Sequence, residues 1–259
     1  MPEGDVVWRT ASQLHDALAG RELTRSDFRV PRFATTDLTG RTVTEAVSRG
    51  KHLLTRVEGD ITVHTHLKMD GAWRISAASG YPLRDHRIRL ILANSRWQAV
   101  GSLLGIVEVV RTSREDQAVG HLGPDLLGPA FDAAEAVRRL GDQPDRTIGE
   151  ALLDQRNLAG IGTIYRAETL FLRGVNPWCP VGEVPDLAGL VELARRLLDA
   201  NKTRIQTITT GNAARGGELW VYGRAGQRCR RCGSVIRRGS LGPQPEERIA
   251  VWCPRCQPL

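Results

Sequence analysis

The end of the chain carries four cysteines at a spacing that constrains the fold more than any other feature. Two Cys-x-x-Cys pairs begin at Cys229 and Cys253, with twenty residues between the pairs. Each pair can point two sulfurs at one ion, and zinc favours four thiolates in a tetrahedron. Disulfides are the alternative, but the chain shows no signal-peptide pattern, which indicates a cytosolic protein with reduced thiols. We predict one structural Zn2+ per chain, with these ligands: Cys229, Cys232, Cys253 and Cys256.

Positive charge gathers in the same part of the chain. Residues 201–259 contain eleven Lys and Arg against three Glu, whereas the whole protein of 259 residues has a net charge of +7. Ten of the eleven are Arg, whose planar guanidinium suits phosphate oxygens. A merely solvated charged surface is the alternative. Arginines on a metal-fixed scaffold favour phosphate binding, with affinity that falls steeply as salt rises.

The first half of the chain has a leading helix followed by short strands. Apolar residues recur at helical spacing up to Leu18, and Gly20 stands where a helix would stop, which predicts a helix over 5–19. After this helix the sequence pattern changes to short runs of β-forming residues separated by turns, one of which lies at 79–82. The runs lie at 42–44, 53–57, 61–64, 87–92 and 106–110. Many short strands indicate an antiparallel sandwich or barrel.

The second half reads as helical. Gly, Pro and Asp residues between 120 and 129 indicate a linker, and helical patterns follow at 131–140, 147–155, 165–172 and 187–200. We therefore predict a multi-domain α+β protein. Its parts are an N-terminal β-sandwich domain with a leading helix at 1–122, a helical domain at 123–220 and a zinc finger at 221–259. No apolar run is long enough to span a membrane.

The first residues of the chain indicate catalysis only in combination with the other motifs. If the initiator Met is trimmed, Pro2 has a free secondary amine, and an α-amine is a far better nucleophile near neutral pH than a lysine. Such an amine can attack a sugar carbon and form an iminium, with Glu3 in reach as acid or base. On its own, a Pro-Glu pair at the start of a chain almost always has no catalytic role.

A glycine-punctuated segment at 152–165 joins a helix to a second helix that begins at once. Glycines allow the backbone to approach a phosphate closely, and a helix N-terminus presents N–H groups and the positive end of the dipole. We expect this segment to bind a phosphate backbone.

With these residues in view, the chain closely resembles the formamidopyrimidine-DNA glycosylase/endonuclease VIII family over its whole length. The matching motifs are Met-Pro-Glu-Gly at 1–4, Arg-Gly-Lys-His-Leu-Leu at 49–54, His-Leu-Lys-Met-Asp-Gly at 66–71, the segment 152–165, Val-Tyr-Gly-Arg at 221–224 and the stretch 248–257. The resemblance implies base-excision repair of oxidised DNA bases and makes the helical domain a helix–two-turn–helix domain.

The resemblance also implies roles for individual residues. Pro2 would be the nucleophile and Glu3 the proton donor, while Lys51 would contact phosphates and assist elimination. Arg248 would grip the phosphate beside the lesion and so belongs with the catalytic set. Met69 would insert into the gap left by a flipped base. The remaining DNA-binding residues would be Asn157, Gly160, Gly162, Thr163 and Arg224.

Three departures from the family pattern bear on substrate. Thr163 stands where the family commonly has Asn, which we expect to keep an N-capping oxygen and shorten a phosphate contact. Val6 replaces a frequent Glu. Leu103 and Leu104 stand where the oxidised-purine branch carries Arg-Phe. This loss, together with Gly4, favours the endonuclease VIII branch and oxidised pyrimidines.

We therefore expect a bifunctional DNA glycosylase/AP lyase that forms a Schiff base through Pro2 and cleaves by β,δ-elimination. The alternatives are an oxidised-purine glycosylase and a non-catalytic zinc-dependent binder of damaged DNA. The set of Pro2, Glu3 and Lys51 separates the enzyme from the binder, because binding alone does not require it. The expected partner is damaged double-stranded DNA, with single-stranded DNA left open. The protein is expected to be a cytoplasmic, nucleoid-associated monomer that is not secreted.

Overall fold

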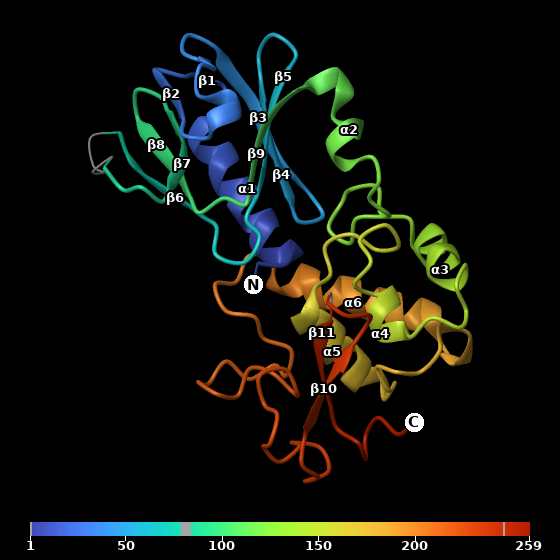
Figure 1. Ribbon diagram of the computed structural model, residues 1–259. Helices are drawn as coiled ribbons and strands as arrows, with labels where there is room; N and C mark the ends of the chain where they lie inside the picture. The colour runs from blue at the N-terminus through green and yellow to red at the C-terminus, as the bar shows by residue number, and fades with distance from the viewer. Residues whose placement is uncertain (1, 79–83, 246) are drawn as a thin grey trace. The chain divides into compact units, whose positions relative to one another are not determined.

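The computed structural model describes residues 2–78, 84–245 and 247–259, so Met1 and the turn expected at 79–82 lie outside the described residues. The described chain divides into two compact units, 1–121 and 122–259 (Figure 1). No described helix has the length and apolar content of a membrane span.

The first unit begins with helix α1 (Gly4–Leu18), which shares a core with two antiparallel sheets. The five-stranded sheet has the order β1-β3-β4-β5-β9, and the four-stranded sheet has the order β2-β7-β8-β6. The strands are β1 (Arg21–Glu22), β2 (Arg25–Phe28), β3 (Thr42–Arg49), β4 (His52–Val57), β5 (Ile61–His66), β6 (Ala72–Ala77), β7 (Ile88–Ala93), β8 (Trp97–Ser102) and β9 (Ile106–Arg111). The predicted β-sandwich with a leading helix is therefore confirmed.

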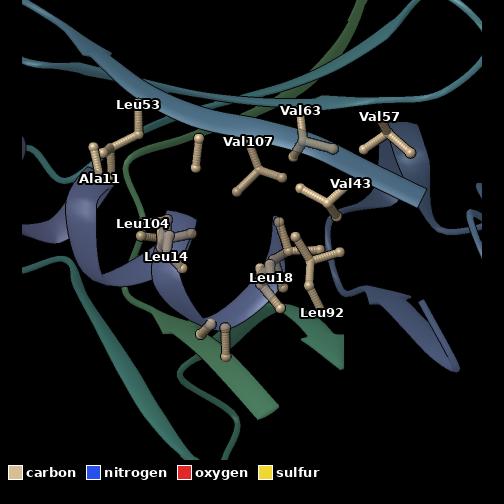
Figure 2. Packing of buried hydrophobic residues seen from close by; sticks show 14 of the residues in the cluster. Ala11, Leu14, Leu18, Val43, Leu53, Val57, Val63, Leu92, Leu104 and Val107 are labelled. Atoms are coloured by element: carbon tan, nitrogen blue, oxygen red, sulfur yellow. The ribbon is translucent and has the colours of Figure 1, made fainter. Parts of the chain in front are cut away.

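The core of this unit forms because α1 and the strands each have one apolar face. Leu14 and Leu18 of α1 are fully buried, and they pack against residues of both sheets such as Val63 and Leu92. Figure 2 shows Val43, Val63 and Val107 of the five-stranded sheet and Leu92 of the four-stranded sheet in one cluster with Leu14 and Leu18 of the helix. Burying one large aliphatic side chain stabilises the fold by roughly 1.5–3 kcal/mol. The helix thus shares one apolar core with both sheets.

Short helical segments complete the first unit and lead to the end of its chain. They are η1 (Pro31–Phe33), η2 (Thr112–Arg114) and α2 (Asp116–Val119). Arg56 of β4 ties this end to the sheet, since its guanidinium makes ion pairs with Glu115 at 2.7 Å and with Glu45 of β3.

The second unit is helical and ends in a two-stranded hairpin. Its elements are α3 (Ala133–Gly141), α4 (Ile148–Ala151), α5 (Thr163–Arg173), η3 (Val181–Glu183), α6 (Leu187–Asn201), β10 (Arg237–Leu241) and β11 (Arg248–Trp252). The helix expected over 147–155 is much shorter than predicted. Its chain turns after Ala151, and Ala159 then donates to the carbonyl of Pro124 at 2.9 Å.

Two apolar cores stabilise this unit. The larger joins α3, α5 and α6 around fully buried residues such as Leu140, Tyr165 and Leu190. The smaller packs Phe171 of α5 against the hairpin and against two of the cysteines. The four-cysteine module is therefore part of the same compact unit as the helices.

Candidate functional site

The amino end of α1 places a buried acid directly beside Pro2. Glu3 is 1% exposed, and its backbone carbonyl accepts the hydrogen bond of Val7 at 3.0 Å, so the residue caps the helix through its backbone. Its side chain makes no capping bond to the helix. The Glu3 carboxyl therefore lies at the positive end of the helix dipole, next to the residue that would carry the reactive amine.

Lys51 occupies a two-residue turn between β3 and β4. Arg49 and His52 pair across the strands, so Gly50 and Lys51 alone make the connection. Gly50 has φ 58°, a left-handed conformation that glycine adopts at low cost. The turn presents the lysine at the end of the five-stranded sheet.

Two exposed apolar side chains stand on neighbouring loops of the first unit. Met69 is 62% exposed and Leu103 is 39% exposed, and they are the exposed large hydrophobic residues of the described part of this unit. The loops are in contact, because a Cβ added at Gly105 would lie 2.1 Å from Cγ of Lys68. The backbone amide of Gly105 also donates to the carbonyl of His66 at 2.9 Å. Solvent-exposed apolar residues held in this way suit insertion into an apolar gap.

The glycine-rich turn before α5 is held by a side chain from its own start. The side-chain oxygen of Gln155 accepts the amide of Gly160 at 3.1 Å, and its nitrogen donates to the carbonyl of Ile161 at 3.0 Å. Gly160 has φ 100°, which explains the glycine at this position. Asn157 donates from its side chain to the carbonyl of Ala151 at 3.1 Å, which fixes it within the turn.

The expected N-capping role of Thr163 is wrong. Gly162 is the N-cap residue of α5, and Thr163 is the first residue inside the helix. No side-chain cap hydrogen bond is made there. The N-cap glycine has no side chain, so the amino end of α5 is not covered by a capping side chain.

An ion-pair network borders the glycine-rich turn. Asp154 accepts from Arg156 at 2.7 Å and from Arg146 at 2.9 Å, and these guanidinium groups hold the pKa of its carboxyl well below the usual range. The same carboxylate raises the pKa of the Arg156 guanidinium. The network gives the turn a fixed shape and a basic edge.

The four cysteines that the spacing singles out converge in the structure. Their Sγ atoms all lie within 4.8 Å of one another, with Cys229 to Cys256 at 3.9 Å and Cys232 to Cys253 at 3.4 Å. A tetrahedral zinc with Zn–S bonds of about 2.3 Å requires sulfurs separated by roughly 3.8 Å. The thiolate donor set and the separations therefore fit a metal ion of this kind.

The surroundings of the cluster act on its thiols in opposite directions, because burial raises the pKa of Cys253 and of Cys256. Hydrogen bonds from Ser234 lower the pKa of the Cys232 thiol to about 6. The backbone amide of Arg231 donates to Sγ of Cys229 at 3.4 Å. Cys179 lies elsewhere, packed against the helical core.

The two arginines singled out by the sequence have different surroundings. Arg224 folds back on its own loop, since its guanidinium donates to the carbonyls of Trp220 and Arg228 and to the side chain of Gln227. Arg248 is exposed at the start of β11, opposite Leu241 in the hairpin. Its position makes it the more accessible of the two cations.

Several buried polar residues that organise the site are absent from the sequence prediction. Glu168 of α5 is fully buried and accepts the backbone amides of Trp220, Val221 and Tyr222 at 2.8–2.9 Å. Gln257 is also fully buried, and its side chain joins the amide of Cys253 to the carbonyl of Val175, just after α5. A charged residue within an otherwise apolar helix face, and a Gln directly after the last Cys, are the signals that point to them.

Comparison with known proteins agrees with this architecture. The model of the formamidopyrimidine-DNA glycosylase N-terminal domain matches residues 1–100, and that of the H2TH domain of the same proteins matches residues 122–186. The chain is 56% identical to a probable endonuclease 8 2 of Streptomyces coelicolor, over 99% of this chain and 94% of that protein. It is 48% identical to the DNA-(apurinic or apyrimidinic site) lyase Nei2 of Mycolicibacterium smegmatis, over 99% of each.

The fold is also that of a solved structure. The formamidopyrimidine-DNA glycosylase of Lactococcus lactis, bound to DNA that contains an AP site, superimposes with a TM-score of 0.83. The two chains are 23% identical, and the match covers 99% of this chain and 100% of that one. At this identity the likeness concerns the arrangement of the elements.

Proposed function

This chain belongs to the formamidopyrimidine-DNA glycosylase/endonuclease VIII family and is a DNA-repair enzyme of the endonuclease VIII type, and we propose that it excises oxidised pyrimidines through a Schiff base at Pro2. The observation that carries the proposal is the buried Glu3 directly after Pro2, at the amino end of α1. A carboxyl withdrawn from water beside a secondary amine suits the transfer of a proton to a sugar that the amine attacks.

The proposed reaction has two stages. The Pro2 nitrogen attacks C1′ of the damaged nucleotide and the bond from C1′ to the base breaks, while Glu3 protonates the opening sugar ring. The resulting iminium acidifies C2′, so loss of a proton there expels the 3′ phosphate. A second elimination then expels the 5′ phosphate and leaves a one-nucleotide gap. Lys51, at its turn, contacts the phosphates and assists these eliminations.

The exposed pair Met69 and Leu103 supports recognition by base flipping. When a nucleotide leaves the duplex, a gap opens in the stack, and apolar side chains can fill it. Leu103 is apolar where oxidised-purine enzymes carry the Arg-Phe pair, which supports a preference for oxidised pyrimidines and a weak dependence on the opposite base.

The second unit supplies the proposed backbone contacts. The turn of Asn157, Gly160, Gly162 and Thr163 offers glycine backbone and a helix N-terminus, and Arg248 offers an exposed guanidinium. Arg224 is the second candidate for a phosphate contact. A structural zinc ion at Cys229, Cys232, Cys253 and Cys256 would hold the hairpin that carries Arg248, with damaged double-stranded DNA as the partner.

The test is covalent trapping by borohydride. The purified protein is first weighed by mass spectrometry, which shows whether Met1 has been removed and Pro2 is free. It is then mixed with a duplex that carries an abasic site, in the presence of borohydride. We expect a cross-link at Pro2 in protein that lacks Met1. A protein with a free Pro2 that binds the duplex without a cross-link would contradict the enzymatic proposal and favour a DNA-binding role.

A further inference from the structure

A row of histidines crosses the five-stranded sheet on the face opposite the α1 core. His52 of β4 pairs with His66 of β5, and His64 of β5 pairs with Glu108 of β9. His52 Nδ1 lies 2.8 Å from His64 Nε2, and His64 Nδ1 lies 3.0 Å from Glu108 Oε2. The three side chains therefore form a continuous hydrogen-bonded chain, the Glu108–His64–His52 chain, across three neighbouring strands.

The hydrogen bonds couple the orientations of the two imidazole rings. Nδ1 of His64 faces a carboxyl oxygen of Glu108, and the other ring nitrogen of His64, Nε2, faces Nδ1 of His52. The donor and acceptor roles of one ring therefore depend on those of the other. A carboxylate that orients an imidazole through its other nitrogen is the usual way in which proteins set the tautomer of a functional histidine.

The His52 end of the Glu108–His64–His52 chain contacts both loops that carry proposed functional residues. His52 directly follows Lys51 in the turn between β3 and β4. The ring of His52 also meets the ring of His66 edge to face, with centroids 4.8 Å apart. His66 Nδ1 accepts the backbone amide of Lys68 at 2.9 Å, and Lys68 precedes Met69. A continuous set of contacts thus runs from Glu108 to the Lys51 turn and to the Met69 loop.

The histidines at this end are neutral. Burial, together with the charges of neighbouring histidines and of Lys68, lowers the pKa of His52 to about 3. Burial and the charges of Lys68 and Lys51 lower the pKa of His66 to about 4. Neutral rings keep the donor and acceptor pattern intact and add no charge beside the two lysines. The other titratable groups that face His52 are His64 and His121.

We propose that Glu108, His64 and His52 form a positioning network that holds the Lys51 turn and the Met69 loop in one fixed relation for the reaction proposed above. The network rests on that proposed function, and its members are positioning residues that act through Lys51 and Met69. His64 is 2% exposed, so its ring cannot reorient freely, and the order imposed at Glu108 is passed on to His52. The usual cost of misplacing a reacting group by about 1 Å is roughly 10²-fold in rate.

The protein contains a residue that serves as a matched control for Glu108. The side chain of Glu45 has the same exposure, 39%, and lies on the same sheet, but it makes an ion pair with Arg56 instead of a histidine. Glu108→Leu removes the acceptor that starts the network. Glu108→Gln keeps an acceptor oxygen for His64 without the charge. Glu45→Leu removes a carboxylate of equal exposure that lies outside the network.

The experiment compares these full-length variants with the wild-type protein in single-turnover borohydride trapping on an abasic duplex, and in duplex binding by fluorescence anisotropy. We expect Glu108→Leu to trap about 10- to 10²-fold more slowly, with a Kd within about threefold of the wild type. Glu108→Gln should recover most of the rate. Glu45→Leu should trap at the wild-type rate. Thermal unfolding of each variant shows that the compared proteins are folded.

Other outcomes would overturn the proposal. Equal trapping by Glu108→Leu and wild type means that the network does not position Lys51. Equal losses in Glu108→Leu and Glu45→Leu mean that both carboxylates only stabilise the sheet. If Glu108→Leu does not fold, His52→Leu takes its place, with the same expected loss of rate at unchanged affinity. A wild-type protein with free Pro2 that does not trap contradicts the proposed function itself, and the positioning role with it.

Discussion

The guanidinium of Arg166 donates a hydrogen bond to the backbone carbonyl of Ile249, the residue after Arg248. Arg166 lies in α5 and is 1% exposed, and it also donates to the carbonyl of Gly149. The helix that follows the glycine-rich turn therefore holds the start of β11 directly. A buried charged donor of this kind is costly to leave unpaired, so the contact fixes the hairpin relative to the turn.

The first prediction concerns the exposed residue that this contact positions. Arg248→Ala should weaken binding to every duplex and should reduce the slope of log affinity against log salt by about one phosphate contact. The reason is that a guanidinium on a phosphate releases a counterion whatever the base sequence. The measurement is fluorescence anisotropy over a range of salt concentrations.

Arg138→Ala is the matched control for this prediction. It removes the same charge from α3, where Arg138 makes ion pairs with Glu135 and Asp142. We expect its salt slope to equal that of the wild type. An unchanged slope for Arg248→Ala would assign the contact to another arginine, with Arg224 the next to test.

The second prediction concerns the metal. Reduced protein should contain one zinc per chain, and Cys253→Ser should lose it, because one of four thiolates is gone. The variant should lose DNA affinity while the first unit stays folded, since the cysteines lie in the second unit. Elemental analysis and limited proteolysis measure both effects. Cys179→Ser should keep the zinc, and active protein that contains no zinc would refute the assignment.

The class of fold follows from the sequence because its signals are local. The apolar spacing of α1 predicts the helix to within one residue at each end, and Gly20, with φ 69°, ends it as expected. The strands β1, β2, β6 and β8 of the first unit and both strands of the hairpin, β10 and β11, escape the prediction. β6 has mixed exposure along its length, and β8 contains Gly101, where a Cβ would lie 2.5 Å from Leu104. Their pairing depends on contacts between distant segments.

The convergence of the cysteines is predictable for the same reason, since each Cys-x-x-Cys pair is a local unit. The buried polar residues are different. The role of Glu168 depends on three amides some fifty residues away, and that of Arg166 depends on a carbonyl 83 residues away. The histidine chain likewise requires the register of β4, β5 and β9. A single sequence carries no direct signal for such pairings.

The third prediction concerns substrate choice. Leu103 offers an apolar surface but no guanidinium to read the base opposite a lesion, so oxidised pyrimidines should be excised faster than 8-oxoguanine, with little effect of the opposite base. Met69→Ala should slow excision from duplexes because the gap is left unfilled. Single-turnover excision on paired duplexes measures these rates. Faster excision of 8-oxoguanine opposite cytosine would favour the oxidised-purine alternative.

The fourth prediction concerns pH and stability. The pKa of His52 falls from 6.5 to about 3 on folding, and that of His66 falls to about 4. Below pH 6.5 the unfolded chain therefore binds protons that the folded protein does not, and the free energy of unfolding decreases as the pH falls toward 4. His52→Gln should flatten this dependence of Tm on pH. His86→Gln, whose side chain is 93% exposed, should leave it unchanged.

The last prediction separates the roles of Pro2 and Glu3. Pro2 is proposed to form the covalent bond, so an uncleaved N-terminal tag that blocks its amine should abolish both base excision and borohydride trapping. DNA affinity should stay close to that of the tag-free protein. Glu3 is proposed to deliver a proton during base release, which a preformed abasic site no longer requires. Glu3→Gln should therefore lose base excision by roughly 10²–10⁴-fold and keep some cleavage at abasic sites.

These two results distinguish the mechanism from its rivals. Trapping by the tagged protein would identify another amine as the nucleophile, Lys51 being the first to test, and the Pro2 mechanism would be wrong within the same family. Equal losses of excision and abasic-site cleavage in Glu3→Gln would show that the buried carboxyl also serves the elimination steps. Because Glu3 caps α1 through its backbone carbonyl and not through its side chain, the substitution should leave the helix intact, so either loss reports on chemistry.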